Sequence, residues 1–130
     1  MKIAPEIRKL VAKAWEVRRN AYTPYFRFPV GAALLAEDGR IFAGCNVENA
    51  SGSAIFCAET SALGAAVSAG ARKFKAVAIV GPEKAFLLPC GVCRQKLAEF
   101  APDLDVYASK KNGDVARYKL STLLPNPMKL

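Results

Sequence analysis

Two short cysteine-bearing segments constrain this chain more than any other feature of its sequence. Cys57-Ala58-Glu59 and Pro89-Cys90-Gly91-Val92-Cys93 each stand at the start of an apolar stretch that is typical of a helix. Cys90 and Cys93 would lie one helical turn apart, so their two thiols could bind a common ligand. A third sulfur, from Cys57, would bring the starts of two helices to the same point.

Hydrophobic periodicity predicts the elements around these segments. We expect helices over residues 6–20, 57–69 and 90–100, and strands over 30–36, 41–45, 76–80, 105–109 and 115–119. Turns are expected at Asp38-Gly39 and Asn112-Gly113, a loop over 46–55, and a last short turn capped by Ser121 and running through Leu124. Helix 57–69 is apolar on nearly every face, so we expect it to be buried and central. Small residues at 31–33 predict a close packing contact. The pattern predicts one α/β domain, residues 1–130, with a five-stranded mixed sheet flanked by helices.

The absence of histidine limits the metal ligands to cysteine, aspartate and glutamate. Thiolates from Cys57, Cys90 and Cys93 suit zinc and leave its fourth tetrahedral position open for water. Helix starts carry partial positive charge, which favours thiolate. Glu59, two residues after Cys57, is placed to move protons to and from that water. The sequence therefore indicates a hydrolytic zinc site with Glu59 as its proton carrier.

Other interpretations of the same residues remain open. Cys57 could be a core thiol, and Glu59 a first-turn glutamate that merely interacts with the helix dipole. The Cys90–Cys93 pair could be a redox pair. Cys45 is expected to be a core thiol. If it were instead a fourth ligand, the site would be closed, and the protein would be a non-enzymatic, zinc-stabilised binding module.

Composition restricts the partners and the compartment. The net charge is +8, but the basic residues are scattered and do not alternate with aromatics, so no nucleic acid partner is expected. The first residues lack the apolar core of a secretory signal, and no apolar run reaches membrane-spanning length, so we expect no membrane association and a reducing cytoplasm. A hydrophobic content of 52% is a weak indication of an oligomer.

Three further segments extend the pattern over nearly the whole chain: residues 21–33, residues 44–50, and Leu123-Leu124-Pro125. On these segments and the two cysteine clusters, the sequence resembles the small, three-cysteine, homotetrameric cytidine deaminases. A Cys-x-Glu paired with Pro-Cys-x-x-Cys is typical of zinc deaminases. The resemblance implies a three-layer cytidine deaminase-like domain with one zinc ion per chain. It also implies hydrolysis of cytidine or deoxycytidine to the uridine product and ammonia, in pyrimidine salvage. A homotetramer, or a dimer, would share active sites between its chains.

The resemblance also implies residue roles. Zinc would be bound by Cys57, Cys90 and Cys93, and Glu59 would take a proton from water, protonate N3 of cytosine and pass a proton to the departing ammonia. Asn46 and Glu48 would hold the sugar hydroxyls. The other residues implied to act at the site are Phe28, packed near the base and sugar, and Ala58 and Leu88, whose backbones would read the pyrimidine edge and amino group. Arg94 is expected to lie behind the metal ligands, where it could supply some compensation for the arginine that the family has at the position of Thr60.

Four positions depart from the family pattern. Thr60 stands where the family usually has an arginine thought to temper the thiolate charge, and Gly52 where it commonly has a tyrosine. Phe26 replaces a usual small polar residue. The tail after Pro125 lacks the phenylalanine that stacks on the base from another chain. These changes predict weakened or redirected base recognition. The nearest alternative is a deaminase of a modified cytosine nucleoside such as a blasticidin-type antibiotic.

Overall fold

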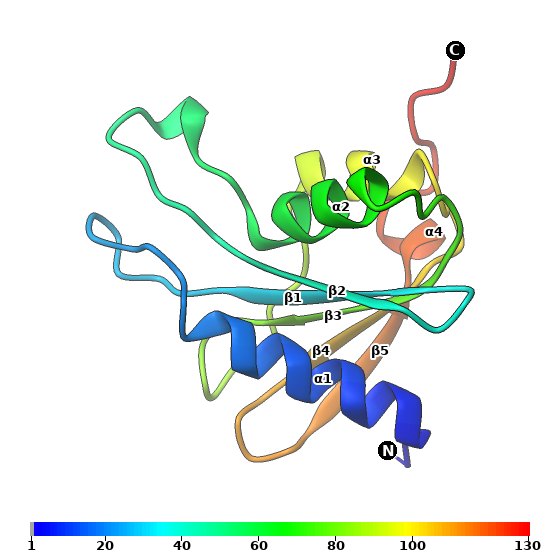
Figure 1. Cartoon of the computed structure of the whole chain (residues 1–130), viewed down its shortest axis with the longest axis horizontal. Helices are drawn as coiled ribbons and strands as arrows, with labels where there is room; N and C mark the ends of the chain where they lie inside the picture. Colours follow the sequence, from blue (N-terminus) through cyan, green and yellow to red (C-terminus); the bar gives the residue numbers. More distant parts are fainter. Residues whose placement is uncertain (1) are drawn as a thin grey trace.

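The chain forms three layers, with a five-stranded mixed sheet between helices (Figure 1). The computed structural model describes residues 2–130. Its elements are α1 Pro5–Arg18, β1 Gly31–Ala36, β2 Ile41–Cys45, the 3-10 helix η1 Gly52–Ala54, α2 Ala58–Ser68, β3 Phe74–Val80, α3 Gly91–Ala98, β4 Asp105–Ser109, β5 Val115–Lys119 and α4 Leu120–Leu123. None of the helices in the described part has the length and apolar character needed to cross a membrane.

The strand order of the sheet is β2-β1-β3-β4-β5. The β1–β2, β1–β3 and β4–β5 pairs are antiparallel, and β3–β4 is the one parallel pair in this sheet. A parallel pair needs a crossover connection, and the segment containing α3 supplies it. The mixed sheet expected from the alternation of strands and helices is confirmed, with a central strand, β3, buried along most of its length.

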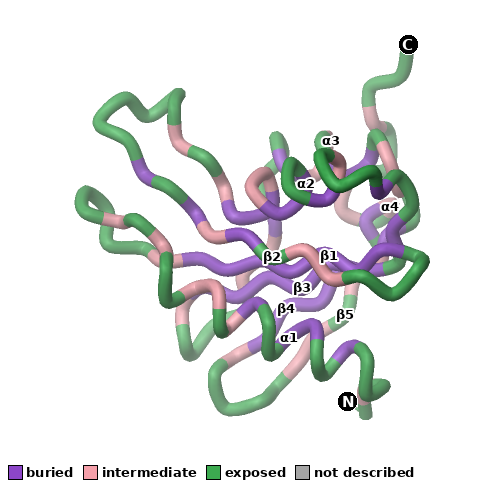
Figure 2. Tube along the Cα trace, in the orientation of Figure 1, coloured by how far each residue is buried: buried purple, intermediate pink, exposed green. Residues whose placement is uncertain are grey.

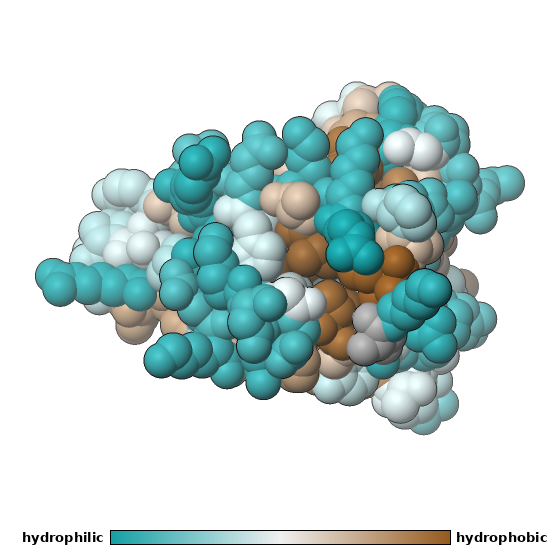
Figure 3. Space-filling view, turned by 90° about the horizontal axis from the view of Figure 1, so that it is seen from below, coloured by the Kyte–Doolittle hydropathy of each residue, from teal (hydrophilic) through white to brown (hydrophobic). Residues whose placement is uncertain are grey.

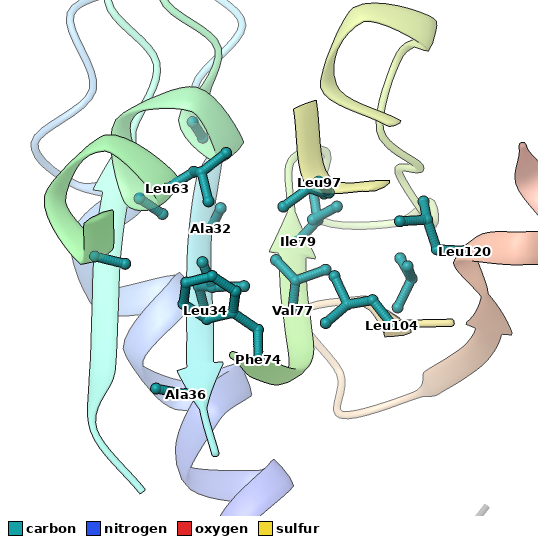
Figure 4. Close-up of a cluster of buried hydrophobic side chains, with 14 of the residues drawn as sticks. Ala32, Leu34, Ala36, Leu63, Phe74, Val77, Ile79, Leu97, Leu104 and Leu120 are labelled. Atoms are coloured by element: carbon teal, nitrogen blue, oxygen red, sulfur yellow. The ribbon is translucent and has the colours of Figure 1, made fainter. Parts of the chain in front are cut away.

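Alternate residues of β1 and β3 face opposite sides of the sheet, and both sides are covered by helices. On one side, Ala33 and Leu35 pack with Leu10 of α1 in one buried cluster. On the other, Leu34 and Val77 belong to a cluster that includes residues of α2 and α3 (Figure 4). Because both faces are covered, β1 is buried at every position (Figure 2).

Two glycines allow the helices to approach the sheet closely. A side-chain carbon at Gly31 would collide with the carbonyl oxygen of Ala14 in α1. A side-chain carbon at Gly44 would collide with the backbone of α2, at the amide nitrogen of Ala62 and the carbonyl oxygen of Ala58. The close contact predicted for residues 31–33 is therefore present at Gly31, and Gly44 seats the start of α2 against β2.

The observed elements differ from the expected ones at their ends. β3 begins two residues earlier than expected, at Phe74, which pairs with Ala36 beyond an irregularity in the β1–β3 register. The last helix begins at Leu120 with Lys119 before it and no side-chain cap, so the expected capping role of Ser121 is wrong. The loop over 46–55 contains η1.

The prediction that α2 is buried on nearly every face is also wrong. Its buried side is formed by Ala58, Glu59, Ala62, Leu63 and Ala66. Gly64 and Ala65 are exposed on the other side. Four of the eleven residues of this helix are alanine and occur on both its buried and its exposed sides, so composition alone does not reveal which face meets the core.

The basic residues of α1 lie on a solvated surface. Arg8, Lys9 and Lys13 are exposed, between the buried positions of the same helix. Seen from below relative to Figure 1, the side of the molecule that carries α1 is largely hydrophilic around a smaller hydrophobic area (Figure 3). An amphipathic helix face accounts for this part of the positive charge.

Candidate metal centre and active site

Two helix starts bring three thiols together. Cys57 immediately precedes α2, Cys90 immediately precedes α3, and Cys93 lies in the first turn of α3. The sulfur atoms of these three residues all lie within 4.8 Å of one another. Sulfur ligands of a tetrahedral zinc ion with Zn–S bonds of about 2.3 Å are roughly 3.8 Å apart, so the cluster is positioned to bind one such ion.

Local sequence explains why the helices start at these points. Cys57 and Cys90 both have extended backbone conformations, with ψ of 153° and 171°, and the helical hydrogen bonds begin at their carbonyl groups, which accept from Ser61 and Arg94. Pro89 disfavours helical geometry in the residue before it, which delays the start of α3 to this point. The positive ends of two helix dipoles therefore meet at the sulfur cluster, where they offset negative charge.

The pKa values of the three thiols differ because their surroundings differ. Burial raises the pKa of Cys57 and of Cys93. Burial acts on Cys90 as well, but hydrogen bonds from the backbone N–H groups of Cys93 and Val92 and from the Cys93 thiol lower its pKa overall. Binding of a metal ion would therefore displace protons from this cluster.

Glu59 is a buried carboxyl beside the thiols. It is 6% exposed and lies on the inner face of α2. Burial raises the pKa of the Glu59 carboxyl, and hydrogen bonds from its own backbone N–H and from the Cys93 thiol partly offset this rise. A carboxyl whose protonated form is favoured by burial is better suited to accept and return a proton than an exposed carboxylate is.

A cavity of about 230 Å³ opens beside this carboxyl and two of the thiols. Its lining residues are Phe28, Val30, Asn46, Ile55, Cys57, Ala58, Glu59, Leu87, Leu88 and Cys90. The cavity thus gathers most of the residues named from the sequence, while Glu48, Cys93 and Arg94 are not part of its wall. Val30, Ile55 and Leu87 were missed, and the only signal for them is their closeness in the chain to Phe28, Cys57 and Leu88.

Asn46 and Glu48 hold two loops together. Asn46 is buried, and its side chain accepts a hydrogen bond from the N–H of Val30 at 2.9 Å and donates one to the carbonyl of Phe28 at 2.8 Å. The Oε1 atom of Glu48 accepts hydrogen bonds from the N–H groups of Tyr25 and Phe26, both at 2.9 Å. These contacts fix Phe28 at the cavity and involve only one of the two carboxylate oxygens of Glu48.

Arg94 and Cys45 are the two remaining residues named from the sequence, and neither is a member of the sulfur cluster. Arg94 donates hydrogen bonds to the carbonyls of Pro89, at 2.7 Å, and Leu123, at 2.9 Å, so it ties the start of α3 to the C-terminal segment. Its effect on thiolate charge stays a prediction. Cys45 pairs with Gly31 across the β1–β2 ladder and does not belong to the group of sulfur atoms that could share one metal ion. The closed four-cysteine site is therefore not formed.

Comparison with known proteins identifies the family of this chain. The family model for the cytidine and deoxycytidylate deaminase zinc-binding region matches residues 5–109. A cytidine deaminase of Sporosarcina psychrophila is 47% identical over 121 residues, which cover 92% of this chain and 89% of the relative. A cytidine deaminase of Halalkalibacterium halodurans is 46% identical over 117 residues, which cover 89% of each chain.

Solved structures agree with these sequence matches. The crystal structure of cytidine deaminase from Burkholderia pseudomallei has a TM-score of 0.88 at 44% identity, covering 93% of this chain and 98% of that one. The structure of cytidine deaminase from Mycobacterium tuberculosis has a TM-score of 0.84 at 37% identity, covering 98% of this chain and 100% of that one. The sulfur cluster, the buried Glu59 and these matches together place the chain in the cytidine and deoxycytidylate deaminase family.

Proposed function

We propose that this protein catalyses the zinc-dependent hydrolytic deamination of cytidine and deoxycytidine, which yields uridine or deoxyuridine and ammonia and serves pyrimidine salvage. The observation that carries the proposal is the buried carboxyl of Glu59 beside three thiols that are positioned to bind one metal ion. When bound by these sulfur atoms, zinc supplies a Lewis acid that makes water nucleophilic at neutral pH.

The protein's own groups would then bind the nucleoside and move protons. Glu59 accepts a proton from the attacking water and gives it to N3 of the cytosine ring. It then accepts the second proton from the hydroxyl group formed at C4 and gives it to the departing amino group, so that water is consumed and ammonia released. The backbones of Ala58 and Leu88, both at the cavity wall, contact the polar edge of the base. Phe28 packs against the base and sugar, and Asn46 and Glu48 hold the sugar hydroxyls.

The cavity favours a nucleoside over a nucleotide. Its wall contains no lysine or arginine, and its only acidic residue is Glu59. A phosphate group bound there would lose water without gaining a cationic partner, which costs free energy. Asn46 and Glu48 form an Asn-x-Glu pair that resembles the family's ribose-binding segment, which favours an unmodified nucleoside over an antibiotic of the blasticidin type.

A substrate panel tests this preference with the zinc-loaded protein. We expect loss of the cytosine ultraviolet chromophore with cytidine and deoxycytidine, and a kcat/KM for deoxycytidylate that is lower by roughly 10–100-fold because its phosphate has no partner. Blasticidin S should not be deaminated at a comparable rate. Turnover of the antibiotic or the nucleotide, with neither nucleoside converted, would contradict the proposed substrate class.

We further propose that residues 1–130 form a single domain that assembles as a homotetramer with shared active sites, in a reducing cytoplasm that keeps the three clustered thiols free. Large aromatic side chains lie exposed on the loops beside the cavity, among them Phe26 at 69% and Phe56 at 58%. A second chain packed there would remove them from water. Gly64 and Ala65 on the outer face of α2 would allow close approach of another helix.

Light scattering coupled to gel filtration measures the assembly directly. With chains of 14.0 kDa, we expect a species of about 56 kDa, because four chains allow each cavity to be completed by a neighbour. An active monomer at micromolar concentration would contradict the shared active site. A stable, active dimer would contradict the tetramer but would still allow two chains to share their sites.

A further inference from the structure

A hydrogen-bonded pair links the outside of the molecule to the most buried sulfur. The hydroxyl oxygen of Thr60, on α2, lies 3.9 Å from the sulfur of Cys93. The ammonium group of Lys96, on α3, donates a hydrogen bond of 3.0 Å to the same hydroxyl oxygen. Cys93 is fully buried, whereas Lys96 is exposed, so Thr60 is the bridge between them.

The chemistry of the three groups fixes the direction of the hydrogen bonds. A lysine ammonium is a donor only, so the Thr60 oxygen must accept from Lys96. A thiolate that binds a metal has no proton to give and can only accept. The Thr60 proton is therefore directed to the Cys93 sulfur, and positive charge from Lys96 strengthens that donation by polarising the hydroxyl.

The same pair connects the two helices that carry the metal ligands. Thr60 follows Cys57 by one helical turn on α2, and Lys96 follows Cys93 by one helical turn on α3. Side chains one turn apart share a helix face, so both partners lie on the sides where the helices meet. No carboxylate within the described residues forms an ion pair with Lys96, so no anionic side chain neutralises its positive charge.

The metal site would carry a net negative charge that the Thr60–Lys96 pair could moderate. Three thiolates and one divalent zinc ion carry a formal charge of −1, and the ionised form of Glu59 adds another negative charge beside them. A donor to a ligand sulfur withdraws electron density from it and leaves the metal a stronger Lewis acid. We propose that Thr60 and Lys96 form a positioning pair that moderates the negative charge of the Cys93 sulfur and so tunes the metal for the deamination reaction.

Cobalt(II) in place of zinc makes the sulfur charge visible by spectroscopy. Removal of the positive charge in Lys96→Met, or of the hydroxyl in Thr60→Val, should make the sulfur a better electron donor. The sulfur-to-cobalt charge-transfer bands should then shift to longer wavelength, while the visible bands that report tetrahedral geometry stay in place. Lys96→Arg and Thr60→Ser keep the charge and the hydroxyl, so they should restore the spectrum of the unaltered protein.

Two comparisons separate this effect from a general structural one. Lys75→Met removes an exposed lysine from β3 that has no hydrogen bond to the thiol cluster, and it should leave the bands unchanged. In the double variant, Lys96→Met should add little to the shift already caused by Thr60→Val, because the hydroxyl carries the effect of the charge. In the zinc enzyme, each single loss should lower kcat/KM by roughly 10–100-fold.

The tuning role rests on the proposed function, but the two can fail separately. If the unaltered zinc protein does not deaminate any cytosine nucleoside, the function is wrong, whatever the bands do. If the nucleosides are deaminated but the charge-transfer bands of Lys96→Met and Thr60→Val match those of the unaltered protein, the pair does not act on the sulfur. A shift of equal size in Lys75→Met would also overturn the pair, and so would a shift in Thr60→Val that Lys96→Met does not share.

Discussion

Replacement of Glu59 by glutamine is expected to lower kcat for cytidine by roughly 10²–10⁴-fold while one zinc ion per chain remains bound. Glutamine has nearly the same size and can still form hydrogen bonds, but it cannot take up and return a proton. Glu59 lies beside the thiols but does not belong to the group that could bind the metal, so its replacement should leave zinc binding intact. Turnover and metal content, measured on the same preparation, test both parts.

The burial of Glu59 adds an expected effect on stability. Glu59 is only 6% exposed, and burial of its charged carboxylate away from water costs free energy of folding. A neutral amide at this position removes that cost, so Glu59→Gln should be at least as stable to heat as the unaltered protein. A gain in stability combined with a loss of turnover is typical of a site residue held in place for its chemistry.

Glu6 provides a matched control, because Glu6 and Glu59 are both first-turn glutamates, of α1 and α2 respectively. If Glu59 served only to interact with a helix dipole, the two substitutions by glutamine would have similar small effects on stability and none on turnover. We expect Glu6→Gln to keep full activity. Retained turnover in Glu59→Gln would remove the proton carrier from the mechanism.

The sequence was a good guide to the sheet but a weaker one to helix faces and element ends. The apolar run of β1, followed by the turn signal Asp38-Gly39, predicted the β1–β2 hairpin. The prediction was correct because the two paired strands are neighbours in the sequence. The early start of β3 at Phe74 depends on its pairing with Ala36, more than 35 residues away. Such a partner cannot be recognised from the residues next to Phe74 alone.

The metal cluster was predictable for a similar reason. Cys57 and the Cys90–Cys93 pair stand at helix starts, and this local position already limits where their sulfur atoms can point. The Thr60–Lys96 pair was not predictable, because it depends on how α2 and α3 pack against each other. The sequence also gave no sign that Asn46 and Glu48 use their polar atoms to join two loops.

Whether the metal site has three or four sulfur ligands decides between an enzyme and a closed structural site. Serine in place of Cys93 should lower zinc affinity by more than roughly 100-fold, since the loss of a ligand exceeds the 10–100-fold effect of changing a neighbour of a ligand. Serine in place of Cys45 should leave one zinc ion per chain and full turnover, because the Cys45 sulfur lies outside the cluster. Chelator competition gives both affinities.

Heat denaturation with and without a chelator gives an independent answer. A metal ion that binds only the folded protein raises the free energy of unfolding in proportion to the logarithm of its affinity. Zinc removal should therefore lower the Tm of the unaltered protein and of Cys45→Ser. In Cys93→Ser the chelator should have little effect, because little zinc is bound at the start. If Cys45→Ser lost its zinc in the same way, the site would hold four sulfur ligands and no open position for water. Hydrolysis at this centre would then be excluded, since a closed tetrahedral site cannot activate a nucleophile.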